Sequence, residues 1–268
     1  NSPEFLIEDT QQSLADTKEW LEASAQFGPL VKPIITPRFV PSCTSELMSG
    51  LGNLAEAYNV PVQSHLSENH GEIEWVAALH PEAANYTDVY YEHHLMGKVP
   101  TVMAHCIHLS DVEMDRMAET QTMVSHCPYS NVNLSSGIAP IRKLFERKIP
   151  IGLGSDISGG HIVSMAKVLT EAIGLSKMKW VEVDQTYAPL TLSEAFYMAT
   201  KGGGKFFGKV GSFEKGCELD ALVIDDTTLF DPNERSLEER LERWLYVGDD
   251  RHIVERYVAG KVAPEPTN

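Results

Sequence analysis

The chain has 268 residues, of which 43% are hydrophobic, and its formal net charge is -16 at pH 7. This length and hydrophobic content are typical of an ordinary globular protein with one sizeable core. The acidic balance argues against a nucleic-acid-binding protein, because such proteins gather Lys and Arg on one face. No run of about 18 apolar residues is present, so the sequence predicts no transmembrane helix.

Four cysteines are spread along the chain, at Cys43, Cys106, Cys127 and Cys217. They form no Cys-x-x-Cys pair, which argues against a zinc ribbon and against a disulfide scaffold. We therefore expect free thiols and a cytoplasmic location. The sequence starts at Asn1 rather than Met, so an earlier targeting signal stays an open alternative.

Short apolar runs alternate with helical patterns along most of the chain. The predicted strands are 31–35, 61–65, 101–105, 122–126 and 149–156. The predicted helices are 9–27, 42–58, 71–79, 87–95, 110–119, 139–147, 160–177 and 191–203. This alternation predicts an α/β fold with a parallel sheet, either a barrel or an open doubly wound sheet. The absence of Gly-x-Gly-x-x-Gly after the first strand favours the barrel.

The last part of the chain has a different pattern. Residues 217–224 and 253–261 read as antiparallel strands around a short charged helix over 236–244. Three glutamates and two arginines of that helix predict an exposed, salt-bridged face. We therefore predict a barrel domain over 1–208 and part of a small β-domain over 209–268.

Polar side chains follow each predicted strand at its carboxyl end. Arg38 lies beyond the first strand, His65, His105 and His126 end the next three, and Asp156 ends the fifth. In a parallel barrel these ends share one rim, where active sites form. Each residue taken alone has a structural alternative, but their recurrence at successive strand ends favours a functional site.

The stretch from Ser64 to Glu68 places an imidazole at a strand end and a carboxylate three residues later. An imidazole such as His65 can bind a metal ion, and Glu68 can move protons from a water that the metal acidifies. Zinc lowers the pKa of such a water to about 7. Two structural alternatives stay open: Glu68 caps the following helix, or Asp156 caps a helix that begins near residue 160.

Other histidines carry weaker signals. The His-x-Glu motif of His70 and Glu72 lacks the Pro-Cys-x-x-Cys that cytidine-deaminase-type zinc sites require, so both are predicted to be surface helix residues. His80, His93 and His94 are predicted to be solvated on polar helix faces. No His-Glu-x-x-His, Gly-x-Ser-x-Gly or P-loop motif is present, so those classes of enzyme have no support.

Several motifs resemble those of the guanine deaminases in the amidohydrolase superfamily. The matching stretches are TPRF at 36–39, QSHLSEN at 63–69, MAH at 103–105, HCPYSN at 126–131, LSSG at 134–137, GLGSD at 152–156, GSFEKG at 211–216 and YVGDDR at 246–251. The strand-end motifs are shared among amidohydrolases, whereas the Pro-Arg-Phe and Gly-Asp-Asp-Arg stretches are more specific to guanine deaminases. The resemblance covers nearly the whole chain and implies a metal-dependent hydrolase barrel.

The resemblance also implies an activity and a role for each strand-end residue. His65 and Asp156 match two zinc ligands, Glu68 the proton shuttle to the purine, and His105 a residue that hydrogen-bonds the attacking water. Asp156 is expected to share the proton transfers with Glu68. The implied reaction is the zinc-dependent hydrolysis of guanine to xanthine and ammonia, with one zinc ion per subunit.

Substrate recognition and assembly follow from the same resemblance. Arg38 matches a residue that reads the purine by donating to its carbonyl oxygen, Phe39 matches a wall of the base pocket, and Glu68 is expected to contact the substrate as well. The expected partners are a small purine and a second copy of the chain, without nucleic acid or membrane. The expected role is in purine catabolism or salvage.

The chain departs from the family at the metal site. The family's first barrel strand carries a His-x-His pair that supplies two more zinc ligands, and no His-x-His occurs here. The predicted strands are also too few for a barrel of eight, so we expect a partial (β/α)8 TIM-type barrel without its N-terminal strands, with a remnant of a small β-sandwich. Alone, the chain is expected to bind zinc poorly and to be inactive. Alternatives are another amidohydrolase (an S-adenosylhomocysteine deaminase, cytosine deaminase or chlorohydrolase) or a non-catalytic fragment.

Overall fold

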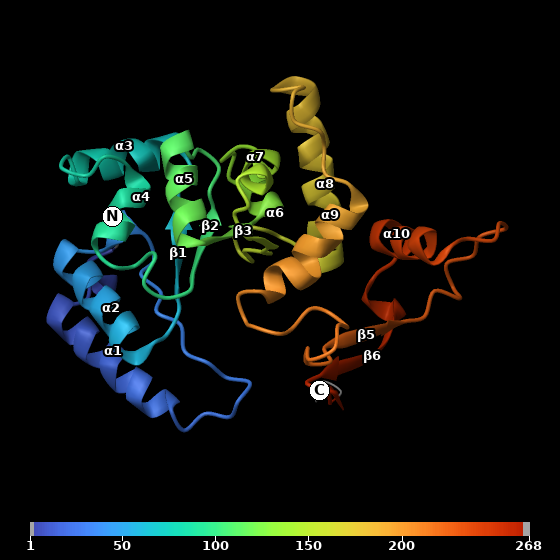
Figure 1. Ribbon diagram of the computed structural model, residues 1–268, viewed down its shortest axis with the longest axis horizontal. Helices are drawn as coiled ribbons and strands as arrows, with labels where there is room; N and C mark the ends of the chain where they lie inside the picture. The colour runs from blue at the N-terminus through green and yellow to red at the C-terminus, as the bar shows by residue number, and fades with distance from the viewer. Residues whose placement is uncertain (1–2, 265–268) are drawn as a thin grey trace. The chain divides into compact units, whose positions relative to one another are not determined.

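The computed structural model describes residues 3–264, and the chain divides into two compact units. The first unit comprises residues 1–125 and 144–149, and the second comprises 126–143 and 150–268. Figure 1 shows the first unit largely in blue and green and the second in green to red. The predicted boundary between residues 208 and 209 stays a prediction. Within residues 3–264, every helix is too short or too polar to span a lipid bilayer.

Parallel strands form the centre of the first unit. Strand β1 (Val62–Leu66) pairs with β2 (Thr101–His105), and β2 pairs with β3 (Met123–His126), in parallel. The helices that follow these strands are α3 (His70–Leu79), α4 (Tyr86–Glu92) and α5 (Asp111–Thr120). Strand β4 (Ile151–Leu153) comes next in the strand order β1-β2-β3-β4. The predicted α/β fold with parallel strands is therefore confirmed.

Two helices precede β1 and lie side by side, α1 (Thr10–Ser24) and α2 (Ser45–Tyr58) (Figure 1). The Asp9 side chain caps α1 by accepting a hydrogen bond from the backbone of Gln12. Short 3-10 helices lie at Glu4–Leu6 and Val40–Ser42. The predicted strand over 31–35 is wrong: only Ile35 forms a parallel bridge, to Val62. Prolines on both sides of this bridge, which cannot donate to a ladder, explain why pairing does not extend.

The second unit contains most of the remaining helices. They are α6 (Pro128–Asn133), the start of α7 (Ile141–Glu146), α8 (Met165–Glu182), α9 (Leu192–Tyr197), a π-helical turn (Met198–Gly202), α10 (Leu237–Val247) and a 3-10 turn (Asp250–His252). Helix α8 contacts α6, α9 and α10, and its buried face includes Val168, Leu169 and Ile173. This helix starts at residue 165, not at 160 as predicted, because residues 156–160 form a tight loop.

A small antiparallel sheet lies near the end of the chain, as predicted. It consists of β5 (Ala221–Ile224), β6 (Ile253–Val258) and β7 (Lys261–Val262), in that order. The arginines of α10 do not pair within the helix. Arg240 forms a two-pronged salt bridge to Asp226, and Arg243 pairs with Asp231, both in the segment before the helix.

Arg142 and Glu194 join two helices of the second unit through a two-pronged salt bridge. The Arg142 guanidinium donates to both carboxylate oxygens of Glu194, at 2.6 and 2.8 Å. The carboxylate also accepts from the backbone of Thr191 at the start of α9. These contacts, of which the hydrogen bonds from Arg142 have the largest effect, lower the pKa of Glu194 from 4.5 to about 2.

We expect Glu194→Gln to lower the free energy of unfolding by about 1–2 kcal/mol at pH 7. Because the folded pKa is depressed, this stabilisation is present above pH 4.5 and is lost as the pH falls from 4.5 towards 2. Urea denaturation across this pH window measures the loss. Glu214→Gln, which weakens the exposed pair with Lys201, is the matched control and should leave the free energy of unfolding nearly unchanged, because solvent screens that pair. Equal effects of the two variants would contradict the assignment.

Candidate active site

Two histidines meet where strands β1 and β2 end. In the parallel register His65 is opposite Ala104, and Leu66 is opposite His105. Regular alternation would turn His105 to the same face as Leu66. Instead His105 has a φ of 69° and Cys106 a φ of 52°, so the extended backbone ends there. The rings of His65 and His105 stack with their centroids 5.4 Å apart.

Glu68 lies in the loop that follows β1 and faces His105. Its Oε2 atom is 3.6 Å from Nε2 of His105, a residue that is almost fully buried. The separation exceeds a direct hydrogen bond but suits two groups that share a small molecule between them. The alternative that Glu68 caps the next helix is excluded, because Asn69 caps α3.

The carboxylate of Glu72 holds the Glu68 loop in place. Its Oε2 accepts a hydrogen bond from the backbone of Glu68 at 2.8 Å, and its Oε1 accepts one from the hydroxyl of Tyr86 at 2.7 Å. Glu72 is buried, so its prediction as a surface residue is wrong. It also completes a capping box with Asn69, in the Asn-x-x-Glu spacing that was the available sequence signal.

The imidazole of His65 is oriented by a backbone carbonyl. Its Nδ1 lies 2.6 Å from the carbonyl oxygen of Arg38, which can only accept a hydrogen bond. Nδ1 therefore carries the proton, and Nε2 keeps the lone pair that a metal ion requires. The hydroxyl of Tyr90 donates to the carbonyl of His65 at 2.8 Å, and burial raises the pKa of Tyr90, which keeps it protonated.

Arg38 and Phe39 lie beside the ends of these strands, on the segment after Ile35. The Arg38 guanidinium is 5.6 Å from the centroid of the Phe39 ring. The edge of Trp75, from α3, meets the same ring at a centroid distance of 6.2 Å and an angle of 80°. Sequence reasoning missed Trp75, because no motif or period links it to Phe39.

Asp156 belongs to the second unit and follows β4. It has a φ of 44°, and its carbonyl accepts from Gly160 at 2.6 Å, so the chain turns back at once. A side chain on Gly159 would collide with the Asp156 carboxylate and with the hydroxyl of Ser130 from α6, at 2.8 and 2.6 Å. The alternative that Asp156 caps a helix is excluded, because Ser164 stands at the start of α8.

The predicted site residues thus fall into two groups. Arg38, Phe39, His65, Glu68 and His105 lie together in the first unit, whereas Asp156 follows β4 in the second. The buried His126 at the end of β3 is assigned to the second unit as well.

The histidines set aside by the sequence reasoning have mixed environments. His80 is buried and lies 3.4 Å from a carboxylate oxygen of Glu82, so its prediction as solvated is wrong. Burial and the nearby His80 lower the pKa of His93, which is half-buried. The exposed His70 lies against His108, with ring centroids 4.0 Å apart and the rings tilted by 36°. In the part of the chain that the structure describes, no group of three or more His, Cys, Asp or Glu side chains is arranged to hold a metal ion.

Comparison with known proteins places the chain in a family. A model described as "Amidohydrolase family" matches residues 4–263, and the chain belongs to that family. Guanine deaminase from Dictyostelium discoideum is 43% identical over 268 residues, which is 97% of this chain and 59% of that protein. The chain therefore spans about three-fifths of the length of this curated relative.

Solved structures give the same relationship. A guanine deaminase from C. acetobutylicum with guanine bound in its active site superimposes with a TM-score of 0.95 and 52% identity, covering 98% of this chain and 62% of that one. A zinc-bound adenosine deaminase from Xanthomonas campestris has a TM-score of 0.80 at 22% identity, covering 94% and 56%. The second likeness shows the fold alone. Together these structures agree with the predicted partial barrel.

We expect the His65 imidazole to be in the Nδ1–H tautomer, because the Arg38 carbonyl accepts from that nitrogen. A two-dimensional ¹H–¹⁵N spectrum that resolves ring nitrogens of the 268-residue chain above pH 7.5 tests this, with His65→Gln used for assignment. A protonated Nε2 and a bare Nδ1 would contradict the orientation.

Proposed function

We propose that the whole protein that contains this chain is a guanine deaminase, which hydrolyses guanine to xanthine and ammonia. The observation that carries the proposal is the group of His65, Glu68 and His105 at the ends of β1 and β2. A second support is the 52% identity to a structure with guanine in its active site. A role in purine catabolism or salvage follows from this substrate.

We propose zinc as the cofactor, held by His65 through Nε2 and by Asp156. The donor chemistry fits, since an imidazole fixed by a backbone carbonyl and a carboxylate are both usual zinc ligands. When bound, zinc acidifies a water at neutral pH. Catalytic zinc normally has three protein ligands, so we propose that the 268-residue polypeptide alone binds zinc weakly and turns over little guanine.

Proton transfers are assigned to Glu68, with His105 and Asp156. Oε2 of Glu68 takes one proton from the attacking water and delivers it to a ring nitrogen of the purine. The second proton of that water passes to the amino group, the C–N bond breaks, and the amino group leaves as ammonia. Nε2 of His105, at 3.6 Å from that oxygen, donates a hydrogen bond to the same water and orients it. Asp156 serves as a second acceptor beside the water.

Substrate binding is assigned to Arg38 and Phe39. The flat face of a purine suits stacking on Phe39, whose ring is held by the edge of Trp75. The guanidinium of Arg38, next to that ring, can donate to the carbonyl oxygen of guanine. An oxygen at that place distinguishes guanine from an adenine-type base, which carries an amino group instead.

The other readings of this site are a different amidohydrolase and a non-catalytic fragment. The alternative of a different amidohydrolase is tested by measuring ammonia release by the whole protein. The substrates compared are guanine, cytosine, adenosine and S-adenosylhomocysteine. Turnover of any of the last three with none of guanine would overturn the proposal. The alternative of a non-catalytic fragment is tested by zinc analysis. This alternative predicts a protein with neither bound zinc nor turnover. A cytoplasmic homodimer is our further proposal, which solution mass measurement tests in part.

We expect Glu68→Gln in the whole protein to keep its zinc and to lose a factor of about 10²–10⁴ in kcat. Glutamine has the same shape as glutamate but cannot accept the water's proton. Metal analysis and steady-state kinetics are measured on the same sample. Loss of zinc from this variant would mean that Glu68 is a ligand rather than a proton carrier. Glu74→Gln, an exposed glutamate of α3, is the control and should behave as the unsubstituted protein.

We expect Arg38→Ala to weaken guanine binding by a factor of about 10, with a smaller change in kcat, because a charged hydrogen bond to the base is lost. The backbone carbonyl that orients His65 is retained in this variant. An effect confined to kcat, with guanine binding unchanged, would show that Arg38 does not read the base.

A further inference from the structure

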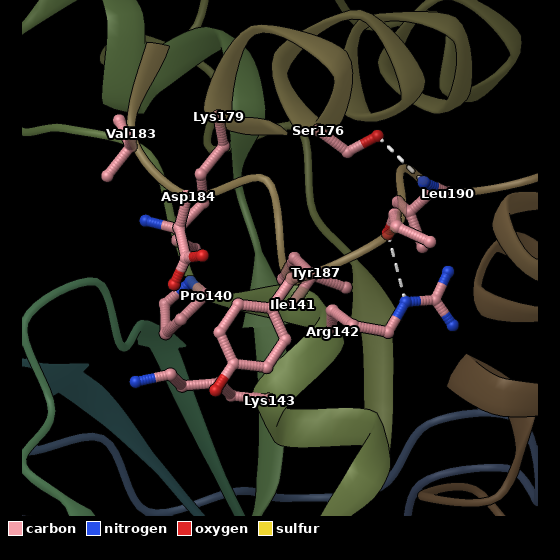
Figure 2. A pocket seen from close by; sticks show the side chains of 12 residues that line it. Pro140, Ile141, Arg142, Lys143, Ser176, Lys179, Val183, Asp184, Tyr187 and Leu190 are labelled. Carbon is pink, nitrogen blue, oxygen red and sulfur yellow. Dashed lines mark hydrogen bonds between the residues drawn. The ribbon is translucent and has the colours of Figure 1, made fainter. Parts of the chain in front are cut away.

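A pocket in the second unit shares no residue with the candidate active site. It has a cavity volume of about 160 Å³. Figure 2 shows Ser176 and Lys179 reaching it from α8, Pro140 to Lys143 lining it at the start of α7, and the loop with Asp184 and Tyr187 forming a further wall. Its apolar surface comes from the residues Ala139, Pro140, Ile141, Val183 and Leu190.

The walls of this pocket are fixed by hydrogen bonds from the protein itself. Arg142 donates to the carbonyls of Ala188 and Pro189, both at 3.0 Å, while it is also bound to Glu194. The hydroxyl of Ser176 accepts from the backbone of Leu190 at 2.9 Å. A pocket held open in this way does not have to order a loop when a ligand enters, which favours binding.

Two lysines bring positive charge to the lining of this pocket. Lys179 uses one N–H to bond the carbonyl of Ile138 at 2.8 Å and so keeps further donors. The Lys143 ammonium lies 5.3 Å from the centroid of the Tyr187 ring, and among residues 3–264 it forms no salt bridge. Burial and the nearby charge of Lys143 lower the pKa of Lys179, so the two cations repel each other.

One carboxylate partly offsets these cations. Asp184 accepts from the backbone and hydroxyl of Thr186, at 2.9 and 2.6 Å, which with Lys143 and Lys179 lowers its pKa. Since Glu194 neutralises Arg142, the pocket keeps one net positive charge in a chain whose formal net charge is -16. A site of this sign in an acidic protein selects for an anion.

We propose that this pocket binds a small planar aromatic carboxylate, with its ring among Pro140, Ile141 and Tyr187 and its carboxylate at Lys143 and Lys179. The size agrees, because an apolar cavity of about 150 Å³ accommodates one benzene ring. A phosphate or acetate ion lacks the ring that the apolar wall would cover. A neutral aromatic molecule lacks the negative charge that would offset the repulsion between Lys143 and Lys179. The site is independent of the proposed deaminase activity.

The test is a titration of the whole protein by NMR, with benzoate as the probe. Saturable binding of benzoate is expected, with benzamide and acetate each weaker by a factor of about 10. Binding of benzamide as tight as that of benzoate would remove the role of charge, and equal binding of acetate would remove the role of the ring. Either result, or the absence of saturable benzoate binding, overturns the proposal.

Three variants connect the binding to these residues. Lys143→Gln should weaken benzoate binding by a factor of about 10, and Asp184→Asn should strengthen it, because asparagine keeps the turn with Thr186 but removes the negative charge. Lys177→Gln, an exposed lysine two residues from Lys179 on α8, should leave the affinity unchanged. Unaltered unfolding midpoints show that each variant is folded. Equal affinities of the Lys143 and Lys177 variants would contradict the assignment.

Discussion

Parallel pairing between β1 and β2 brings the ends of two strands together, and the proposed chemistry depends on what happens there. The register places His65 beside Ala104, one residue before the backbone of His105 leaves the extended conformation. Positive φ values at Ser67, His105 and Cys106 are costly for residues other than glycine, and such residues gather at functional sites. Backbone hydrogen bonds from Cys106 and Ile107 to Leu66 and Ser67 hold the two loops together after the pairing ends. A histidine ring and a carboxylate are thereby kept close together, with Nε2 of His105 3.6 Å from Oε2 of Glu68.

Around this centre, the chain supplies the supports that a reactive group needs. Glu72 holds the Glu68 loop, and the carbonyl of Arg38 fixes the tautomer of His65. Neither support takes part in the proposed proton transfers, but each determines where a reacting atom can sit. In the second unit the close approach of Gly159 to Asp156 has a similar effect, since any side chain there would displace the carboxylate. The site is therefore specified as much by small and buried residues as by the groups that carry the chemistry.

The sequence allowed His65, His105 and His126 to be predicted at or next to strand ends, because parallel strands share one edge and polar residues recur there. It also allowed the antiparallel strands near the end of the chain to be predicted. The start of α8 was predicted too early, because the sequence does not reveal the loop before it, in which Asp156 and Ser158 adopt positive φ values. Glu72 was missed because a charged residue on a helix is usually solvated, and here a tyrosine from α4 covers it. Trp75 was missed because its contact with Phe39 is long-range.

The central claim is that His65, through its Nε2 atom, carries the metal next to the Glu68–His105 pair. The most direct measurement is X-ray diffraction at the zinc absorption edge from crystals of the whole protein with guanine or its product bound. The account predicts one anomalous peak about 2.0–2.1 Å from Nε2 of His65, with the purine ring against Phe39. An anomalous peak at ligand distance from Glu68 would contradict this claim. A purine bound away from Phe39, with no metal near His65, would contradict it as well.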